Sequence, residues 1–204
     1  MKRITTIIAL MLSICISAQA RLVPSSLFSD GMVLQQNTNA RIWGKANPGS
    51  QVSVTTSWNG ATYRAKTDNE GHWTIYASTP AASYKPHTLT IKGDGQTIRI
   101  NDVLIGEVWF ASGQSNMEMP MCGYFNCPVE NSLEYISAPA AREKIRMFKV
   151  HQNQTYEPLE DVENSRWEGA DPYTIPYMSA VAYFFARELN EMLDIPVGIL
   201  SCAY

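Results

Sequence analysis

Ser115 is the residue of this sequence whose type and position best suit a nucleophile. It lies in the segment Gly113-Gln-Ser-Asn-Met117, directly after an apolar stretch at residues 103–111 that predicts a strand buried on both faces. A tight turn at the end of such a strand holds a side chain out of the sheet, where ligands of open α/β sheets bind. A helix beginning near Ser115 would also direct backbone N–H groups at an oxyanion. The segment therefore indicates acyl-transfer chemistry, with Gln114 and Asn116 binding substrate or supporting the turn beside the nucleophile.

The same segment also fits a purely structural role. Its spacing is not the G-x-S-x-G of a nucleophile elbow, because Met117 stands at the position of the second glycine. In this alternative, Ser115 caps a helix, while Gln114 and Asn116 form hydrogen bonds to the loop. Local spacing leaves both interpretations open.

A serine nucleophile needs a general base, and the sequence contains three histidines. His72 and His87 fall in predicted strands, where an imidazole more often packs or faces solvent. His151 follows a strand predicted at residues 145–150 and is expected at the same edge of the sheet as Ser115. It is the candidate substitute base, against the simpler interpretation of a solvent-facing loop residue. Asp161 and Asp171 could orient a histidine, but their spacing selects neither.

The cysteines do not indicate a metal site. Cys122 and Cys127 form a single pair, five positions apart, and no further His or Cys lies near them in the sequence. A zinc site usually takes four such ligands, so this pair is poor evidence for zinc. A disulfide bridge and two buried free thiols both remain open, because spacing does not give the distance between the two Cα atoms.

Residues 21–101 are predicted to form an antiparallel β-sandwich-like domain. Their β-forming stretches are separated by turn signals, of which Asn59-Gly60 is the strongest hairpin signal. Several short strands at this spacing are typical of a sandwich. The predicted strands are residues 40–44, 51–58, 61–66, 72–77, 87–92 and 96–100.

Residues 102–204 are predicted to form the first portion of an α/β domain. Strands are expected at residues 103–111, 145–150 and 196–200, and a helix at residues 178–193. This order favours a parallel sheet, although three strands and one helix leave it incomplete and its last strand short of partners. The apolar face predicted for the helix consists of Val181, Phe184, Phe185, Leu189, Met192 and Leu193.

Residues 1–20 are predicted to be a signal peptide. Lys2 and Arg3 precede an apolar stretch at residues 4–16, and Ala18-Gln-Ala20 supplies a cleavage pattern. The apolar stretch is too short to span a bilayer, and no other segment approaches that length. The chain is therefore expected to be exported to the periplasm or cell exterior of a bacterium. A net charge of -3 without a run of like charge argues against a nucleic-acid partner.

Motifs along most of the chain occur in a recognisable order. They are Leu27-Phe-Ser-Asp-Gly-Met-Val-Leu-Gln35, Ile42-Trp-Gly44, Pro48-Gly49, Asp68-Asn-Glu-Gly-His-Trp73, residues 103–118, Trp167, residues 179–189 and Ile195-Pro-Val-Gly-Ile199. Together they resemble the sialate O-acetylesterase family of SGNH (GDSL-like) hydrolases. The resemblance implies an accessory β-domain followed by a three-layer α/β domain with a parallel sheet.

The resemblance also implies a mechanism and a site. Ser115 matches the nucleophile of the family, and its own backbone N–H is expected to donate to the oxyanion. The implied reaction is hydrolysis of O-acetyl groups of sialic acids or other acetylated glycans through an acyl-enzyme, without a metal or organic cofactor.

The sequence departs from the family pattern on the C-terminal side of the nucleophile. The family's other oxyanion donors and its His and Asp lie further along the chain than Tyr204. The sequence is therefore expected to be the N-terminal part of an esterase, inactive or nearly so by itself. An alternative from another class is an exported glycan-binding module without catalysis.

Overall fold

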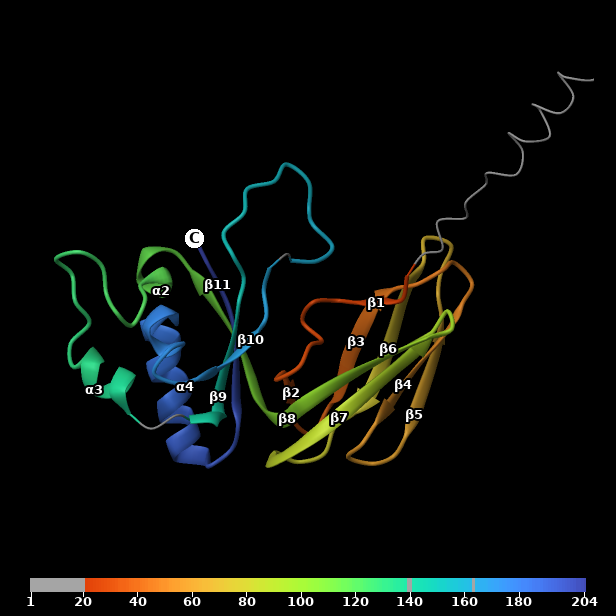
Figure 1. Ribbon diagram of the computed structural model, residues 1–204, viewed down its shortest axis with the longest axis horizontal. Helices are drawn as coiled ribbons and strands as arrows, with labels where there is room; N and C mark the ends of the chain where they lie inside the picture. Colours follow the sequence, from red (N-terminus) through yellow and green to blue (C-terminus); the bar gives the residue numbers. More distant parts are fainter. Residues whose placement is uncertain (1–20, 139–140, 163) are drawn as a thin grey trace, which may run out of the picture.

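The computed structural model of the chain describes residues 21–138, 141–162 and 164–204 (Figure 1). Over these residues the fold is mixed α/β, as expected, with most elements in two sheets. The predicted signal peptide, residues 1–20, lies outside the described residues. The elements are β1 (Val23–Pro24), β2 (Val33–Gln35), β3 (Asn39–Lys45), β4 (Gln51–Thr56), β5 (Thr62–Lys66), β6 (His72–Ser78), β7 (Ser83–Gly93), β8 (Gln96–Gly113), α2 (Ser115–Glu118), α3 (Ser132–Ser137), β9 (Ala141–Lys149), β10 (Trp167–Ala170), η1 (Ile175–Tyr177), α4 (Ala180–Leu193) and β11 (Val197–Ala203).

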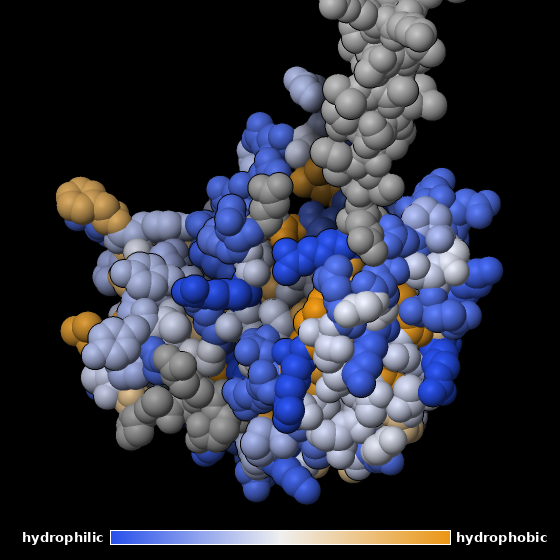
Figure 2. Space-filling model, turned by 45° about the vertical axis from the view of Figure 1, so that its right-hand side comes forward, coloured by the Kyte–Doolittle hydropathy of each residue, from blue (hydrophilic) through white to orange (hydrophobic). Residues whose placement is uncertain are grey.

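The first part of the chain consists of antiparallel strands around one hydrophobic cluster. β1, β3 and β6 form a three-stranded sheet, and β5, β4, β7 and the start of β8 form one end of an eight-stranded sheet. The cluster joins the two sheets through buried side chains such as Ile42, Trp73, Val54 and Leu89. On the face shown in Figure 2, hydrophilic residues cover most of the surface and hydrophobic ones show mainly in recesses.

The hairpin predicted at Asn59-Gly60 is confirmed. β4 and β5 pair antiparallel on either side of it, with Val54 opposite Tyr63. Gly60 has a φ of +68°, a left-handed conformation that glycine adopts without steric cost.

Three parallel strands form the second part. β11 pairs with β8 on one side and with β9 on the other, so that Ile199 lies opposite both Trp109 and Met147. The helix α4 packs against β9 and β11. Its first turn is capped by Ser179, whose Oγ accepts from the N–H of Ala182 at 3.3 Å.

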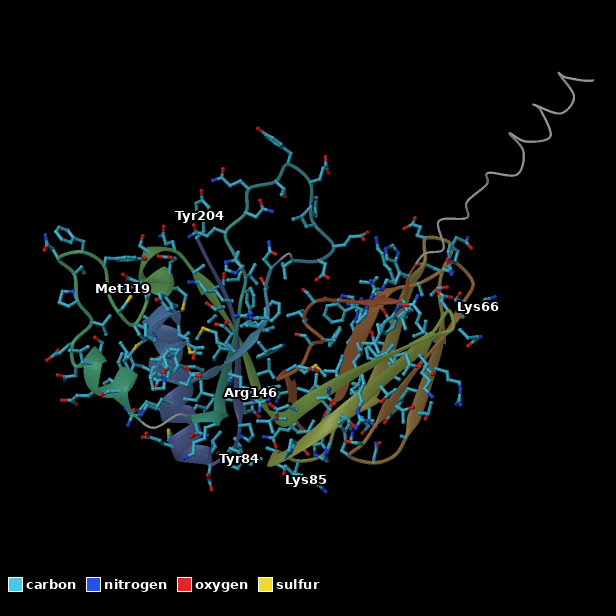
Figure 3. All side chains as sticks on the ribbon, viewed as in Figure 1. Lys66, Tyr84, Lys85, Met119, Arg146 and Tyr204 are labelled. Carbon is cyan, nitrogen blue, oxygen red and sulfur yellow. The ribbon has the colours of Figure 1, made fainter. Side chains whose placement is uncertain are left out.

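The predicted boundary between residues 101 and 102 falls inside β8. This strand pairs with β7 up to Ile105 and with β11 from Glu107 onward, so one strand belongs to both parts. Asp102 interrupts its extended backbone with a φ of +54°. Figure 3 shows Arg146 of β9 near this junction, close to the middle of the molecule. The three-layer arrangement stays a prediction, since α4 covers one face of the parallel strands.

The prediction that the last strand lacks partners is wrong. β11 lies between β8 and β9, because the chain returns to the middle of the sheet after α4. Among the described strands, one open edge lies at β10, which pairs only with β9, and another at residues 107–113 of β8, whose side away from β11 pairs with no described strand. The second of these edges carries exposed aromatic rings, since Trp109 and Phe110 are 44% and 67% exposed.

The helix predicted at residues 178–193 is confirmed over residues 180–193, but its predicted apolar face is right only in part. Phe184 and Leu189 are partly buried and pack against the core, whereas Val181, Phe185, Met192 and Leu193 are exposed. The sheet is contacted instead by the face that carries small side chains, which allow a close approach. The buried residues of α4 are Ala180, Ala182, Tyr183, Ala186 and Asn190.

Neither alternative for the cysteine pair holds in the structure. Cys122 and Cys127 are free thiols, and both are exposed. Their loop is closed by reciprocal backbone hydrogen bonds between Tyr124 and Cys127, at 3.0 and 2.9 Å. Among the helices that the structure describes, none has the length and hydropathy needed to cross a bilayer.

Candidate active site

Ser115 is the first residue of a short helix at the end of β8. The strand ends at Gly113, Gln114 precedes the helix, and the N–H of Glu118 donates to the Gln114 carbonyl at 2.8 Å. The Ser115 side chain is exposed, and its hydroxyl has no hydrogen-bond partner within the described residues. The structure therefore contains the strand, turn and helix that the sequence predicts, with a serine projecting from the turn.

A backbone hydrogen bond holds this turn against the end of β11, and a glycine lets the turn close. The N–H of Tyr204, directly after β11, donates to the Gly113 carbonyl at 3.0 Å. A Cβ at Gly113 would lie 3.0 Å from the Cβ of Met117, so glycine lets the turn close tightly. The end of β11 and the turn before Ser115 are thus fixed to each other.

The far end of α2 is anchored to the start of α4. The Met119 carbonyl accepts from Ala180 N at 2.9 Å, and the N–H of Met121 donates to the Met178 carbonyl at 2.9 Å. Met121 is fully buried. These contacts fix the orientation of α2, although the helix is only one turn long.

The side chains of Gln114 and Asn116 flank the serine and form no hydrogen bond with the described part of the chain. Both are exposed, and Gln114 makes no side-chain cap to α2. Together with Met117 and Val181 they line a cavity of about 330 Å³ around Ser115. The capping role considered for these three residues is therefore not seen among the described contacts, whereas a role toward substrate stays a prediction.

His151 lies at the same end of the sheet as Ser115 but in a different cavity. It follows β9 and lines three cavities at the strand ends, none of which includes Ser115 among its described residues. The imidazole is exposed and makes no hydrogen bond with the described part of the chain. The structure thus does not bring the candidate base into contact with the serine.

The other two histidines belong to the β-rich part. His72 Nδ1 lies 3.4 Å from Asp68 Oδ2, and its Nε2 lies 3.3 Å from Glu160 Oε1. His87 is buried, with Nδ1 3.4 Å from Ser57 Oγ. Burial, together with the nearby Lys85 charge, holds the pKa of His87 below its ordinary value.

The candidate orienting aspartates have structural partners. Asp161 accepts hydrogen bonds from the hydroxyls of Ser25 and Ser26, which tie the loop after β9 to the start of the chain. Burial alone would raise the pKa of Asp161, but hydrogen bonds from Ser26, Val162 and Ser25 outweigh it and lower the pKa. Asp171 accepts from the N–H of Tyr173 at 2.7 Å and so organises a turn.

The strand order also assembles residues that the sequence did not single out. Glu118 and Lys149 share a cavity of about 340 Å³ with His151, Ser179 and Ser201. In the sequence, the only feature that could have indicated this grouping is that Glu118 and Lys149 each lie near the carboxyl end of a predicted strand. That feature does not give strand order, and strand order decides which ends meet.

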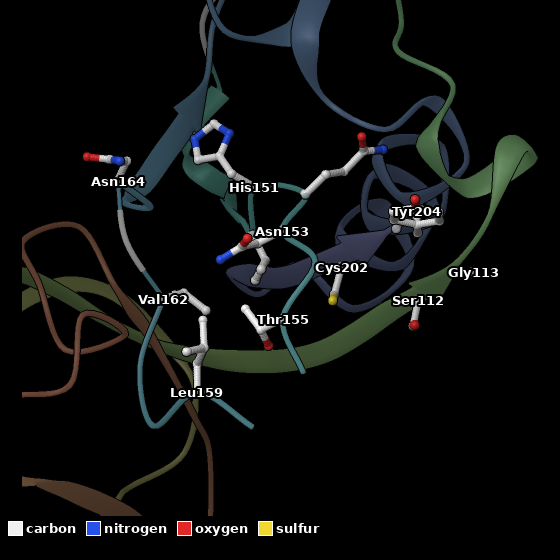
Figure 4. Close-up of a pocket in the computed structure, with 13 residues that line it drawn as sticks. Ser112, Gly113, His151, Asn153, Thr155, Leu159, Val162, Asn164, Cys202 and Tyr204 are labelled. Carbon is white, nitrogen blue, oxygen red and sulfur yellow. The ribbon is translucent and has the colours of Figure 1, made fainter. Parts of the chain in front are cut away.

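The largest cavity at these strand ends has a volume of about 540 Å³ (Figure 4). One wall is the loop after β9, which contributes His151, Asn153 and Thr155. The other wall is formed by the ends of β8 and β11, including Ser112 and Cys202. Within the described ranges, no group of three or more His, Cys, Asp or Glu side chains is placed to hold a metal ion.

The curated relatives and the carbohydrate acetylesterase structure that this chain resembles are longer than it. No protein-family model matches the chain. The sialate O-acetylesterases of Pongo abelii and Homo sapiens are 31% identical to it over 196 residues, which is 88% of this chain and 36% of each relative. Among solved structures, a carbohydrate acetylesterase from Xanthomonas citri superposes with a TM-score of 0.81 and 30% identity, over 90% of this chain and 40% of the other. The chain therefore spans little more than a third of the length of the curated relatives it matches.

Proposed function

The chain is a homologue of the sialate O-acetylesterases, which are carboxylic ester hydrolases, and on this premise we propose that it supplies the nucleophile of a glycan O-acetylesterase. The nucleophile is Ser115, and the substrate is an O-acetyl ester of a sialic acid or of another glycan. The observation that carries this proposal is the exposed, unpartnered Ser115 hydroxyl on a turn at the carboxyl end of a parallel strand.

The reaction proceeds in two steps. Ser115 Oγ attacks the acetyl carbonyl carbon and gives its proton to a general base. The bond between that carbon and the sugar oxygen breaks, and the base gives the proton to this oxygen, so that the sugar leaves with a free hydroxyl. Water then attacks the acetyl-serine, releasing acetate and restoring the hydroxyl. The backbone N–H of Ser115 is at the first position of α2, where no intrahelical acceptor is available, and it donates to the oxyanion of both tetrahedral intermediates.

Among the described residues, no histidine lies in the cavity of Ser115 to act as its general base. General base catalysis typically contributes about 10²–10⁴-fold, and His151 lines cavities separate from that of Ser115. We therefore propose that the 204-residue chain hydrolyses acetyl esters slowly or not at all by itself. The alternative function, a glycan-binding module, is favoured by this same separation.

Export of the chain is part of the proposal. It rests on the basic residues Lys2 and Arg3, the apolar stretch after them, and Ala18-Gln-Ala20. Determining the N-terminal residue of the protein recovered from a bacterial periplasm tests it, and Arg21 is the expected result.

A fluorophosphonate probe tests the nucleophile, since it labels serines whose hydroxyl is activated. Labelling and hydrolysis of p-nitrophenyl acetate are compared for the wild-type chain, Ser115→Ala and Ser132→Ala. Ser132 is a matched control, because it is also the first residue of a short helix, α3. Label that disappears in Ser115→Ala alone supports the esterase, and its loss in His151→Ala would identify the base. Equal labelling of all three proteins overturns the assignment of Ser115. No labelling of any protein is the result expected both for the glycan-binding module and for an esterase chain that lacks its base.

A further inference from the structure

The cavity of about 540 Å³ at the strand ends has the size of a small-molecule site. It adjoins the proposed nucleophile, because Gly113 lines both this cavity and the one around Ser115. A ligand held here therefore lies directly beside the turn that carries the serine. Figure 4 shows that the lining comes from the loop after β9 on one side and from β8 and β11 on the other.

The polar lining consists mainly of neutral groups, three of which have no hydrogen-bond partner among the described residues. The side-chain amides of Gln152, Asn153 and Asn164 line the cavity, and none forms a hydrogen bond within the described residues. Each amide offers two donors and one acceptor oxygen, which suits the adjacent hydroxyls of a sugar ring. Three such groups around one space are therefore available to a polyhydroxylated ligand.

The apolar lining complements these amides. Leu159 and Val162 lie on the loop side, and the ring of Tyr204 stands at the end of β11. The Tyr204 hydroxyl is already bonded to Gln154, so its ring is held in place at the rim. A sugar ring presents C–H groups on its faces as well as hydroxyls at its edge, and this lining can contact both.

Among the described residues that line this cavity, none is Lys, Arg, Asp or Glu. Lys149 and Arg166 line the neighbouring cavities, and Arg166 is paired with Glu168 at 2.9 Å. Removing an ionised carboxylate from water without a cationic partner is costly, whereas a neutral sugar pays no such penalty.

We propose that this cavity binds an uncharged sugar unit, so that the preferred substrate is an acetylated neutral glycan and not an acetylated sialic acid. The inference rests on the proposed esterase function but concerns binding, which does not require turnover.

Binding of two unacetylated probes to the purified chain tests the inference: xylobiose, which is uncharged, and N-acetylneuraminic acid, which carries a carboxylate. The affinities are measured by NMR titration at pH 8, where an ordinary imidazole is uncharged. Xylobiose is expected to bind more tightly, and Asn153→Ala to weaken it about fivefold, since one hydrogen bond contributes about 0.5–1.5 kcal/mol. Asn69→Ala, in an exposed turn of the β-rich part, is the matched control and leaves the affinity unchanged.

Three results would overturn the inference. These are tighter binding of N-acetylneuraminic acid that Lys149→Gln abolishes, no binding of xylobiose, and xylobiose binding that Asn153→Ala does not weaken. Fluorophosphonate labelling of Ser115 reports on the esterase independently, so a failure of sugar binding and a failure of the proposed function give different results.

Discussion

The guanidinium of Arg146 in β9 donates to both the carboxylate and the backbone carbonyl of Asp102, the left-handed residue inside β8. Nη2 lies 2.9 Å from Asp102 Oδ1, and Nη1 also donates to the Gly31 carbonyl at 2.9 Å. Arg146 is buried, whereas the Asp102 side chain is 57% exposed. One side chain therefore ties the α/β strands to the point where the long strand changes direction.

Replacement of Arg146 by alanine is expected to lower the free energy of unfolding by about 3 kcal/mol. The loss arises because the carbonyls of Gly31 and Asp102 lose partly buried hydrogen bonds to a charged donor, which contribute about 1.5–3 kcal/mol each. Asp102→Asn is the control, since Asn also tolerates a positive φ, and it should cost less than about 1 kcal/mol. Urea denaturation measures both, and equal losses for the two variants would contradict this explanation.

Gly106→Ala is expected to separate β8 from the start of β11. A Cβ at this position would lie 2.0 Å from the Pro196 carbonyl oxygen, a backbone atom that cannot move without shifting the strand. The expected loss is about 2–3 kcal/mol, typical of overpacking. Gly113→Ala meets a side-chain atom of Met117 at 3.0 Å and should cost less. Chemical denaturation ranks the two variants, and the reverse order would refute the packing argument.

Acidification is expected to destabilise the β-rich part through His87. Its pKa is lowered by burial, so the unfolded chain takes up a proton more readily than the folded one. The free energy of unfolding therefore keeps its full value above the ordinary pKa of 6.5 and decreases as the pH drops below it. His87→Gln should flatten this dependence, and His151→Gln, at an exposed position, should leave it unchanged. A wild-type unfolding free energy that is constant between pH 7 and pH 5 would count against the prediction.

Asp161→Asn is expected to loosen the loop after β9, which lines the cavity of about 540 Å³ at the strand ends. The carboxylate accepts hydrogen bonds from Ser25 and Ser26, and its pKa lies below the ordinary 3.8. Its contribution is therefore present above that pH and is lost as the pH falls through the lowered pKa. Hydrogen exchange of residues 150–162 at pH 7 should accelerate in this variant but not in Glu157→Gln, a control on the same loop. Unchanged exchange would show that the loop is held by other contacts.

The strands were predictable where the determining interactions are local. Asn59-Gly60 and the alternating residues around it predict the hairpin of β4 and β5 without reference to the rest of the chain. The pairing of β2 with residues 104–106 of β8 joins segments about seventy residues apart, and nothing local indicates it. The central position of β11 likewise depends on which strand edge was left open by earlier elements.

The site was predictable only in part for the same reason. The place of Ser115 follows from the strand before it and the turn that holds it. The cavity beside it combines His151, Ser112 and Tyr204 from three strand ends, and their meeting depends on the order β9, β11, β8. Part of the helix face was mispredicted because apolarity alone was counted, whereas Ala182 and Ala186 decide how closely α4 can approach.

The continuity of β8 determines how this polypeptide can be divided. The strand has 18 residues, or about 60 Å of extended chain, and it reaches from the hairpin with β7 to the residue before Gln114. Cutting it between residues 101 and 102 would leave residues 103–106 in the second half, whereas β7 and β2, which pair with them, lie in the first half. The strand that ends beside the proposed nucleophile is therefore also a strand of the β-rich part.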